Sequence, residues 1–174
     1  MDRRQDLPLG SRVELTPFVR EVVIPGGPGA IPRIDARAAR FLLEFRSSRI
    51  HRWGIFAQEP IPARRVVIEY TGQVITPAEA IRRSLRPSIF TFWLSPRRLI
   101  DGAIGGSGAE YINHSCAPNL IARWRRGRIF LSSRRAIAAG EELLLDYQLA
   151  GNLPRIPCGC GSPDCRGYLN APRF

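Results

Sequence analysis

The sequence predicts a mostly β domain with many short strands and few short helices. From residue 50 onward, short runs of β-branched and aromatic residues alternate with Gly, Pro, Ser and Asn, the pattern of short strands between turns. One stretch, residues 77–83, has the composition of a helix. The segment 101–109 is rich in glycine, which predicts a loop whose backbone approaches a neighbour closely.

The expected elements follow in chain order. Residues 19–24 form a candidate strand, residues 25–29 a loop rich in Pro and Gly, and residues 36–45 either a short helix or a strand. Further strands are expected at 54–57, 66–70, 89–94, 129–132 and 142–147. Thr76 is the expected N-cap of the helix at 77–83, and Pro77 suits the first helical position.

Length and composition set the outer limits. The chain has 174 residues, which fits one domain, and its 26 basic residues against 15 acidic ones give a net charge of +11. All the basic residues are arginine, so the charge indicates either a high-GC codon bias or a nucleic-acid or acidic partner. A hydrophobic content of 44% excludes a disordered chain. No apolar run is long enough to span a membrane, and residues 1–6 lack the apolar core of a signal peptide.

Four cysteines form a candidate metal site. Cys158, Cys160 and Cys165 follow a C-x-C-x4-C spacing in a stretch rich in Gly and Pro, and Cys116 is the remaining cysteine. Tight loops allow several thiolates to converge on one ion, so the spacing favours zinc over reduced structural cysteines. Disulfides are disfavoured because no signal peptide directs the chain to an oxidising compartment. Four cysteine ligands leave no open coordination position, so the metal would be structural.

The segment Asn-His-Ser-Cys-Ala-Pro-Asn at 113–119 concentrates polar residues around a lone cysteine. It could be a polar turn with an incidental histidine, but it resembles the N-H-S-C-x-P-N signature of the SET-domain protein methyltransferases. Further motifs of that family follow in order. They are a cofactor loop at 51–57, E-Y-x-G at 69–72, I-D at 100–101, G-E-E-L-x-x-D-Y at 140–147 and a post-SET cysteine segment at 158–169. The resemblance covers about residues 48–170.

The resemblance implies a β-clip type SET fold with a C-terminal pseudoknot, in which Asn113 and His114 lie beside residues 143–147. It divides the chain into an N-terminal flanking segment (1–47), a SET domain (48–150) and a post-SET zinc-binding tail (151–174). It also implies that Cys116, Cys158, Cys160 and Cys165 share one structural zinc ion. Zinc binding would then order the tail.

The resemblance further implies an activity. The cofactor would be S-adenosylmethionine, released as S-adenosylhomocysteine, and the acceptor a lysine amine of a histone tail or another basic protein. Methyl transfer from a sulfonium requires a neutral amine in line with the S–CH3 bond, which proximity and desolvation in an apolar channel favour. Tyr147 would be the catalytic tyrosine, although it could be a plain core tyrosine at a strand end, and Tyr70 would line the same channel.

The cofactor-binding residues implied by the resemblance lie in four segments. They are His51, Arg52, Trp53, Gly54, Phe90, Glu110, Asn113, His114 and Tyr168. The main chain at 51–53 would hold the methionine portion, with Gly54 permitting close approach. Asn113 and His114 would bind the amino-acid and adenine parts, and the Tyr168 ring would cover the adenine.

Three positions depart from the family pattern. Arg52 stands where a glycine is usual, so the cofactor loop must tolerate a side chain. Glu110 replaces a common arginine and could accept a bond from the cofactor's ammonium or ribose. Leu145 occupies the position where Phe or Tyr limits the number of methyl groups. Because leucine has no hydroxyl to hold a water against the amine, we expect products beyond monomethyl-lysine.

Other interpretations remain open at this point. A non-catalytic basic zinc module could bind nucleic acid or chromatin through the arginines at 123–128 and 134–135, although 123–128 is more typical of a solvated hairpin. A third hypothesis is a SET fold without catalytic activity. It is disfavoured because Tyr147, Asn113 and His114 are all present. A basic substrate would need a locally acidic groove. Candidates for it are Asp101, Glu110, Glu141, Glu142 and Asp146. The expected location is intracellular, either cytoplasmic in a prokaryote or nuclear and chromatin-associated.

Overall fold

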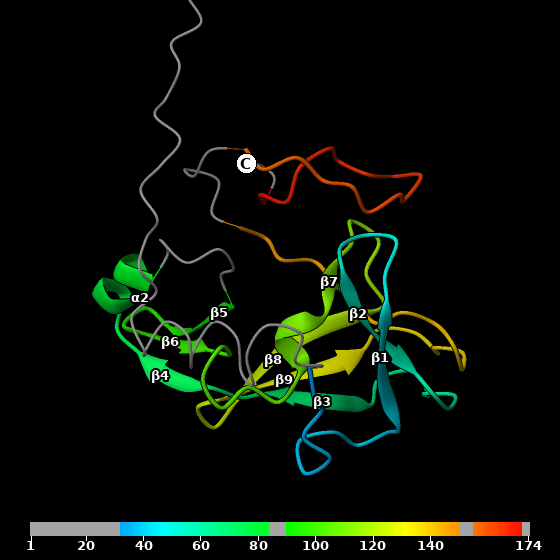
Figure 1. Ribbon diagram of the computed structural model, residues 1–174, viewed down its shortest axis with the longest axis horizontal. Helices are drawn as coiled ribbons and strands as arrows, with labels where there is room; N and C mark the ends of the chain where they lie inside the picture. The colour runs from blue at the N-terminus through cyan, green and yellow to red at the C-terminus, as the bar shows by residue number, and fades with distance from the viewer. Residues whose placement is uncertain (1–31, 84–89, 150–154, 172–174) are drawn as a thin grey trace, which may run out of the picture.

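The computed structural model describes residues 32–83, 90–149 and 155–171 (Figure 1). Within these ranges the strands form two three-stranded and two two-stranded sheets. A single short α-helix and one 3-10 turn complete the described structure. The prediction of a mostly β domain with short strands in small sheets is confirmed.

The central sheet has the strand order β3–β9–β8 and is antiparallel throughout. Its strands are β3 (Val66–Tyr70), β8 (Leu120–Arg125) and β9 (Arg128–Ser133). Strands β8 and β9 form a hairpin closed by Arg126 and Gly127, which both have left-handed φ angles, 49° and 70°. Two successive positive φ angles are typical of a two-residue hairpin turn, so the hairpin expected at residues 123–128 is confirmed.

The second three-stranded sheet lies beside the first and has the order β4–β6–β5 (Figure 1). Its strands are β4 (Gln73–Ile75), β5 (Thr91–Ser95) and β6 (Arg98–Asp101), and α2 (Pro77–Arg83) follows β4. The Thr76 hydroxyl accepts a hydrogen bond from the Glu79 amide at 3.2 Å, which confirms Thr76 as the N-cap.

Two short pairings complete the framework. Strand β1 (Leu43–Ser47) pairs antiparallel with β2 (Trp53–Ala57). Strand β7 (Asn113–His114), which follows the 3-10 turn η1 (Ala109–Tyr111), pairs in parallel with β10 (Leu144–Leu145). This parallel pair places the Asn-His segment beside the Asp-Tyr segment, as the expected topology requires.

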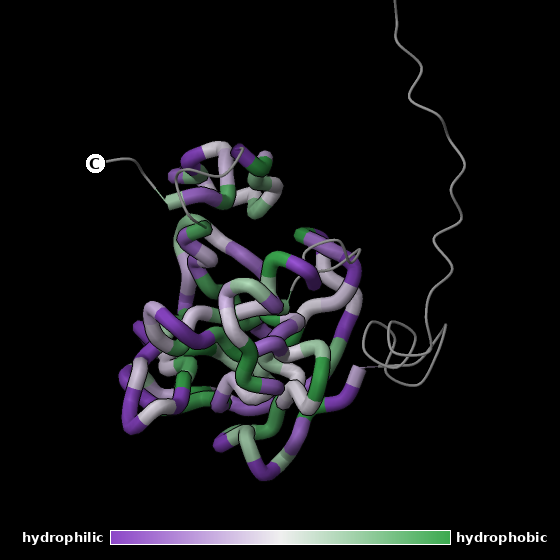
Figure 2. The backbone as a smooth tube through the Cα atoms, turned by 90° about the vertical axis from the view of Figure 1, so that its left-hand side faces the viewer, coloured by the Kyte–Doolittle hydropathy of each residue, from purple (hydrophilic) through white to green (hydrophobic). Residues whose placement is uncertain are grey.

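The core lies between the sheets and is almost entirely aliphatic. Fully buried side chains include Ile55, Ile61, Ile68, Leu120, Ile129, Leu131, Ile137 and Leu143. Burying each such side chain contributes about 1.5–3 kcal/mol, so this cluster holds the sheets together. Figure 2 shows the apolar segments gathered inside the main body. No helix within the described residues is long and apolar enough to cross a bilayer.

The structure corrects several element boundaries. Residues 36–38 form a turn and the strand begins only at Leu43, so the helical option for 36–45 is wrong. The strand expected at 142–147 is only Leu144–Leu145. Strands β4, β6, β7 and β8 were not expected; each is short, and strand pairing rather than a long apolar run defines it. The predicted strand at 19–24 and loop at 25–29 lie outside the described residues.

Candidate functional site

The site is built around the crossing of the segments 113–119 and 141–147. The Ser115 amide donates to the Leu145 carbonyl at 3.1 Å, next to the β7–β10 pair. Asn119, which is fully buried, donates to the Glu142 carbonyl at 2.7 Å and accepts from the Leu144 amide at 2.8 Å. The Asn119 side chain therefore donates to and accepts from the opposite main chain, as a peptide group in a strand would, and it fixes the register in which the two segments meet.

Asn113 connects this crossing to the loop before β2. Its side-chain amide donates to the Trp53 carbonyl at 2.9 Å and to Glu142 Oε1 at 2.8 Å, with a longer contact of 3.4 Å to the His51 carbonyl. Gly54 leaves the space that the Glu142 carboxylate occupies, because a Cβ on Gly54 would lie 2.2 Å from Glu142 Oε1. The structure thus brings together the predicted cofactor residues His51, Trp53, Gly54 and Asn113.

The backbone explains the family's preference for glycine at position 52. Arg52 has a φ angle of 38°, in the left-handed region that residues with a Cβ adopt at a cost of about 1–2 kcal/mol. The arginine side chain points into solvent, so it leaves the loop open. The loop keeps the backbone shape that a glycine would allow, despite the substitution.

His114 and Tyr147 contact each other across the crossing. The Tyr147 amide donates to His114 Nδ1 at 3.1 Å, and the two rings meet edge to face with centroids 5.3 Å apart. Burial lowers the pKa of His114, which keeps the ring neutral. Since Nδ1 accepts a bond, the ring proton is assigned to Nε2, which lies 3.4 Å from the Cys116 sulfur.

The Tyr147 hydroxyl donates to the main-chain carbonyl of Ile112 at 2.8 Å. Burial, with a smaller effect from Glu142, raises the pKa of Tyr147 to about 12. The phenol therefore stays protonated over the physiological range, and it can orient a ligand but cannot act as a base there.

Tyr70 is buried, and its hydroxyl donates to the Phe90 carbonyl at 2.6 Å. Burial raises the pKa of Tyr70 well above its usual value, with further contributions from Glu110 and Asp101. The Phe90 ring packs against Tyr111, with centroids 5.3 Å apart. Tyr70, Phe90 and Tyr111 are therefore neighbours and form one wall of aromatic side chains.

Glu110 lies in η1 and points into the glycine-rich loop. Its Oε2 accepts from the Gly108 amide at 2.9 Å, and a Cβ on Gly106 would lie 2.4 Å from Oε1. Burial raises the pKa of Glu110 to about 7. The loop approaches itself closely here, because a Cβ on Gly106 would also lie 2.1 Å from the Gly102 carbonyl. The glycines of this segment thus make room for the Glu110 carboxylate. The observed hydrogen-bond partner of this carboxylate is the main chain of the loop itself.

The four cysteines converge on one point. Their sulfur atoms all lie within 4.8 Å of one another, and Cys116 Sγ lies 3.9 Å from both Cys158 Sγ and Cys165 Sγ. A tetrahedral ion with Zn–S bonds of about 2.3 Å requires S···S distances of about 3.8 Å. The Gly167 amide contacts Cys165 Sγ at 3.4 Å, a second hydrogen bond aimed at the cluster besides that from His114. All four thiols are free of disulfides, and their arrangement fits zinc.

The tail that carries three of these cysteines is also attached by an arginine. Arg166 donates to both carboxylate oxygens of Asp146 at 2.8 and 2.6 Å, and to the carbonyls of Tyr168 and Leu169. This fork connects the tail to the residue directly before Tyr147. The Tyr168 ring itself lies under the Arg155 guanidinium at 4.6 Å, and among the described residues it makes no ring contact or hydrogen bond with Asn113 or His114.

Sequence reasoning missed the positioning roles of Asn119, Glu142 and Arg166. All three lie inside motifs recognised in the sequence, at 113–119, 140–147 and 158–169, so their positions were a usable signal. The acidic groove expected for a basic substrate is not free. Glu141 pairs with Arg135, Asp146 with Arg166 and Asp101 with Arg83, while Glu142 and Glu110 accept hydrogen bonds from Asn113 and Gly108.

These features define a class: a β domain in which an Asn-His strand pairs in parallel with the Leu144–Leu145 strand, directly before Asp146 and Tyr147 and beside a cluster of four thiols. The SET domain family profile matches residues 52–148, more than half of the chain. The chain therefore belongs to the SET-domain family.

Known proteins with similar sequences carry the same domain. The chain is 41% identical over 144 residues to "Histone-lysine N-methyltransferase, H3 lysine-4 specific" of Schizosaccharomyces pombe, covering 77% of this chain and 16% of that protein. It is 39% identical over 138 residues to "Histone-lysine N-methyltransferase SETD1A" of Homo sapiens, covering 74% of this chain and 8% of that protein. The chain thus spans a small part of the length of these relatives.

A solved structure shares the fold. It is a humanized mutant of the Chaetomium thermophilum Polycomb Repressive Complex 2 bound to the inhibitor GSK343, with a TM-score of 0.56 and 33% sequence identity. The match covers 61% of this chain and 15% of that one.

Proposed function

We propose that this chain transfers methyl groups from S-adenosylmethionine to lysine side chains of proteins, with histones as the substrate class. The observation that carries the proposal is the parallel pairing of Asn113–His114 with Leu144–Leu145, which sets Tyr147 against His114 inside a SET domain. The names of the related histone-lysine methyltransferases support the substrate class. A histone substrate would place the protein in chromatin.

The loop at 51–53 and Asn113 are the proposed holders of the cofactor, with Gly54, Arg52, Phe90, His114, Glu110 and Tyr168 around them. When bound, S-adenosylmethionine supplies a methyl group activated by a sulfonium. The Asn113 amide already fixes the Trp53 carbonyl, so the loop is held ready in one shape. Preorganised main-chain groups of this kind bind a ligand without a further ordering cost.

Tyr147 and Tyr70 are the proposed walls of the lysine channel. Burial in a channel lined by these two neutral phenols lowers the pKa of a lysine amine, so the amine gives its proton to solvent before transfer. The Tyr147 oxygen and the Ile112 carbonyl lie 2.8 Å apart and offer two acceptors for the hydrogens of the amine or the methyl group. Orientation by these oxygens, rather than proton abstraction by Tyr147, is the proposed contribution to the rate.

Zinc on Cys116, Cys158, Cys160 and Cys165 is the proposed structural metal. Three of its ligands belong to the proposed post-SET tail (151–174) and one to the proposed SET domain (48–150), so the ion would join the two. Residues 1–47 are the proposed flanking segment. The rival proposal, a zinc module without catalysis, lacks a reason for the Asn113, His114 and Tyr147 arrangement.

The test uses the full chain loaded with zinc, labelled S-adenosylmethionine and core histones, with the product analysed by mass spectrometry. We expect added methyl groups on lysine Nζ, and no label on the enzyme's own side chains because the chain contains no lysine. Histones whose lysines have been acetylated chemically are the control and should accept no label. Cofactor binding without any transfer to histones or other basic proteins would reject the proposal.

A further inference from the structure

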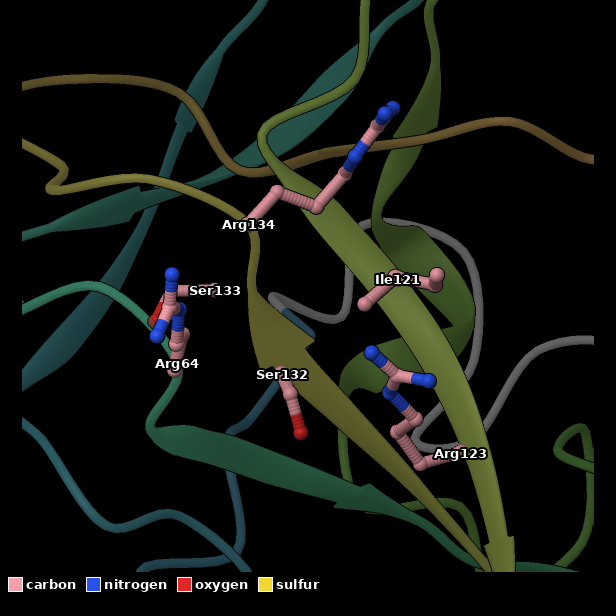
Figure 3. A pocket seen from close by; sticks show the side chains of 6 residues that line it. All are labelled: Arg64, Ile121, Arg123, Ser132, Ser133 and Arg134. Carbon is pink, nitrogen blue, oxygen red and sulfur yellow. The ribbon is translucent and has the colours of Figure 1, made fainter.

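The outer face of the β3–β9–β8 sheet carries arginines that the proposed active site does not use. It holds Arg123 and Arg125 on β8, Arg64 in the turn before β3, and Arg134 directly after β9; we call these four residues the arginine face. All four are exposed. Figure 3 shows the Arg64, Arg123 and Arg134 side chains around a shallow hollow, with the Ser132 hydroxyl and Ile121 between them.

The strand pairing explains why these side chains share one face. Ile121 is the partner of Ser132, Arg123 of Phe130 and Arg125 of Arg128, and directly opposed residues project to the same side of a sheet. The opposite side carries Leu120, Ile129 and Leu131, which are buried in the core. The arginine face is therefore held by a rigid sheet.

Two nearby arginines differ from these four because each of them forms an ion pair. Arg128 pairs with Glu69, and Arg135 pairs with Glu141. Among residues 32–83, 90–149 and 155–171, no ion pair is found for Arg64, Arg123, Arg125 or Arg134. The positive charge of this face is therefore not neutralised within the described part of the protein.

We propose that the arginine face binds the phosphate backbone of duplex nucleic acid. Guanidinium groups bind phosphate oxygens through paired N–H donors and are more weakly hydrated than ammonium groups, which suits them to this contact. Arg123 and Arg125 are two residues apart on one strand, a separation of about 7 Å. Phosphates of one duplex strand follow each other at a rise of about 3.4 Å along the helix axis, so two arginines at this separation can each reach a different phosphate.

The geometry favours a duplex over an acidic peptide. The charges extend beyond the hollow along the β hairpin to Arg125, which suits a long backbone of regularly spaced charges better than a short acidic segment. Four phosphate contacts predict a slope of about −3.6 in a plot of log affinity against log salt concentration.

The test measures binding of a fluorescein-labelled 30-base-pair DNA duplex to the full chain by anisotropy, across a salt series. We expect the affinity to fall roughly 150-fold between 50 and 200 mM salt. A triple variant, Arg64→Gln, Arg123→Gln and Arg134→Gln, should reduce this salt effect to roughly fourfold, because one contact remains. The variant should unfold at the wild-type temperature, since the three side chains are exposed.

The matched control removes three exposed charges from another part of the surface, namely from α2, the β5–β6 turn and the start of β6, through Arg82→Gln, Arg97→Gln and Arg98→Gln. It should keep nearly the full salt slope. Three outcomes would overturn the proposal: no duplex binding at 50 mM salt, an equal loss of slope in the control, or competition by polyglutamate as effective as that by unlabelled duplex. Retention of the slope in the control with its loss in the triple variant supports the proposal.

Discussion

Replacing Arg166 with methionine should detach the cysteine-rich tail from the domain. Arg166 forms a two-bond fork with Asp146 and two further bonds to carbonyls of its own tail. The guanidinium lowers the pKa of Asp146, against an opposing effect of burial, so the carboxylate is charged at neutral pH. Methionine retains a flexible stem like that of arginine and removes every one of these donors.

The magnitude follows from the contacts that attach the tail. Within the described residues, the tail is otherwise joined to the domain by the main-chain hydrogen bonds of Leu149 with Leu169 and Ala171, and by the convergence of its three thiols on Cys116. Hydrogen bonds to a charged partner contribute about 1.5–3 kcal/mol each. Both side chains of the fork are partly exposed, 17% and 19%, so we take the lower value for each bond. The loss is then about 3 kcal/mol, or on the order of 100-fold in the docking equilibrium.

Zinc affinity reports that equilibrium, because Cys116 can join the other three thiols only when the tail is docked. Competition for zinc with a coloured chelator should show a loss on the order of 100-fold for Arg166→Met. Arg155→Met is the matched control from the same tail. Its guanidinium only covers the Tyr168 ring, so the loss should stay below about fivefold. If the Arg166 variant kept zinc as well as the Arg155 variant does, the fork would have no role in docking.

Three other substitutions test separate parts of the site. For Glu110, whose pKa is raised to about 7 from 4.5, the folded state holds a proton that the unfolded state has lost, so stability falls as pH rises through that window. In denaturant titrations, the free energy of unfolding of the wild-type protein should fall by about 3 kcal/mol between pH 5 and 8, and Glu110→Gln should remove that fall. A variant whose stability falls with pH as steeply as that of the wild type would refute this prediction. Gly54→Ala should displace the Glu142 carboxylate and weaken S-adenosylmethionine binding, by about 1–3 kcal/mol in calorimetry, while unchanged binding would mean that the Glu142 position is irrelevant. Leu145→Tyr should restrict the product to monomethyl-lysine, whereas wild-type protein that makes only monomethyl product would already contradict the expectation for leucine.

Much of the fold could be predicted from the sequence because several strands coincide with short apolar runs. Val66–Tyr70 and Arg128–Ser133 carry enough β-branched, aromatic and aliphatic residues to be recognised alone. The pair Asn113–His114 with Leu144–Leu145 could not be recognised in that way. Each strand has two residues and forms only because Asn119 and the backbone of the partner segment hold it.

The candidate site was predictable where the chemistry lies inside a motif. Asn113, His114 and Tyr147 meet as the motif order implied, and the four thiols converge although Cys116 is far from the others in the sequence. The partners that orient these residues were not predictable, because Arg166 and Asp146 are joined by tertiary structure alone. The prediction of a free acidic groove was wrong for the same reason. Composition counts carboxylates but cannot show which arginine or hydrogen-bond donor each carboxylate has as its partner.

The initial rate of methyl transfer by Tyr147→Phe tests the central claim most directly. The measurement uses saturating histone and S-adenosylmethionine, together with the dissociation constant of the cofactor, and Tyr111→Phe serves as the matched control. Loss of an orienting hydroxyl in the transition state should lower the rate by about 100-fold or more while cofactor affinity stays unchanged. A Tyr147→Phe rate equal to that of the Tyr111 variant would contradict the assignment of this site as the catalytic centre.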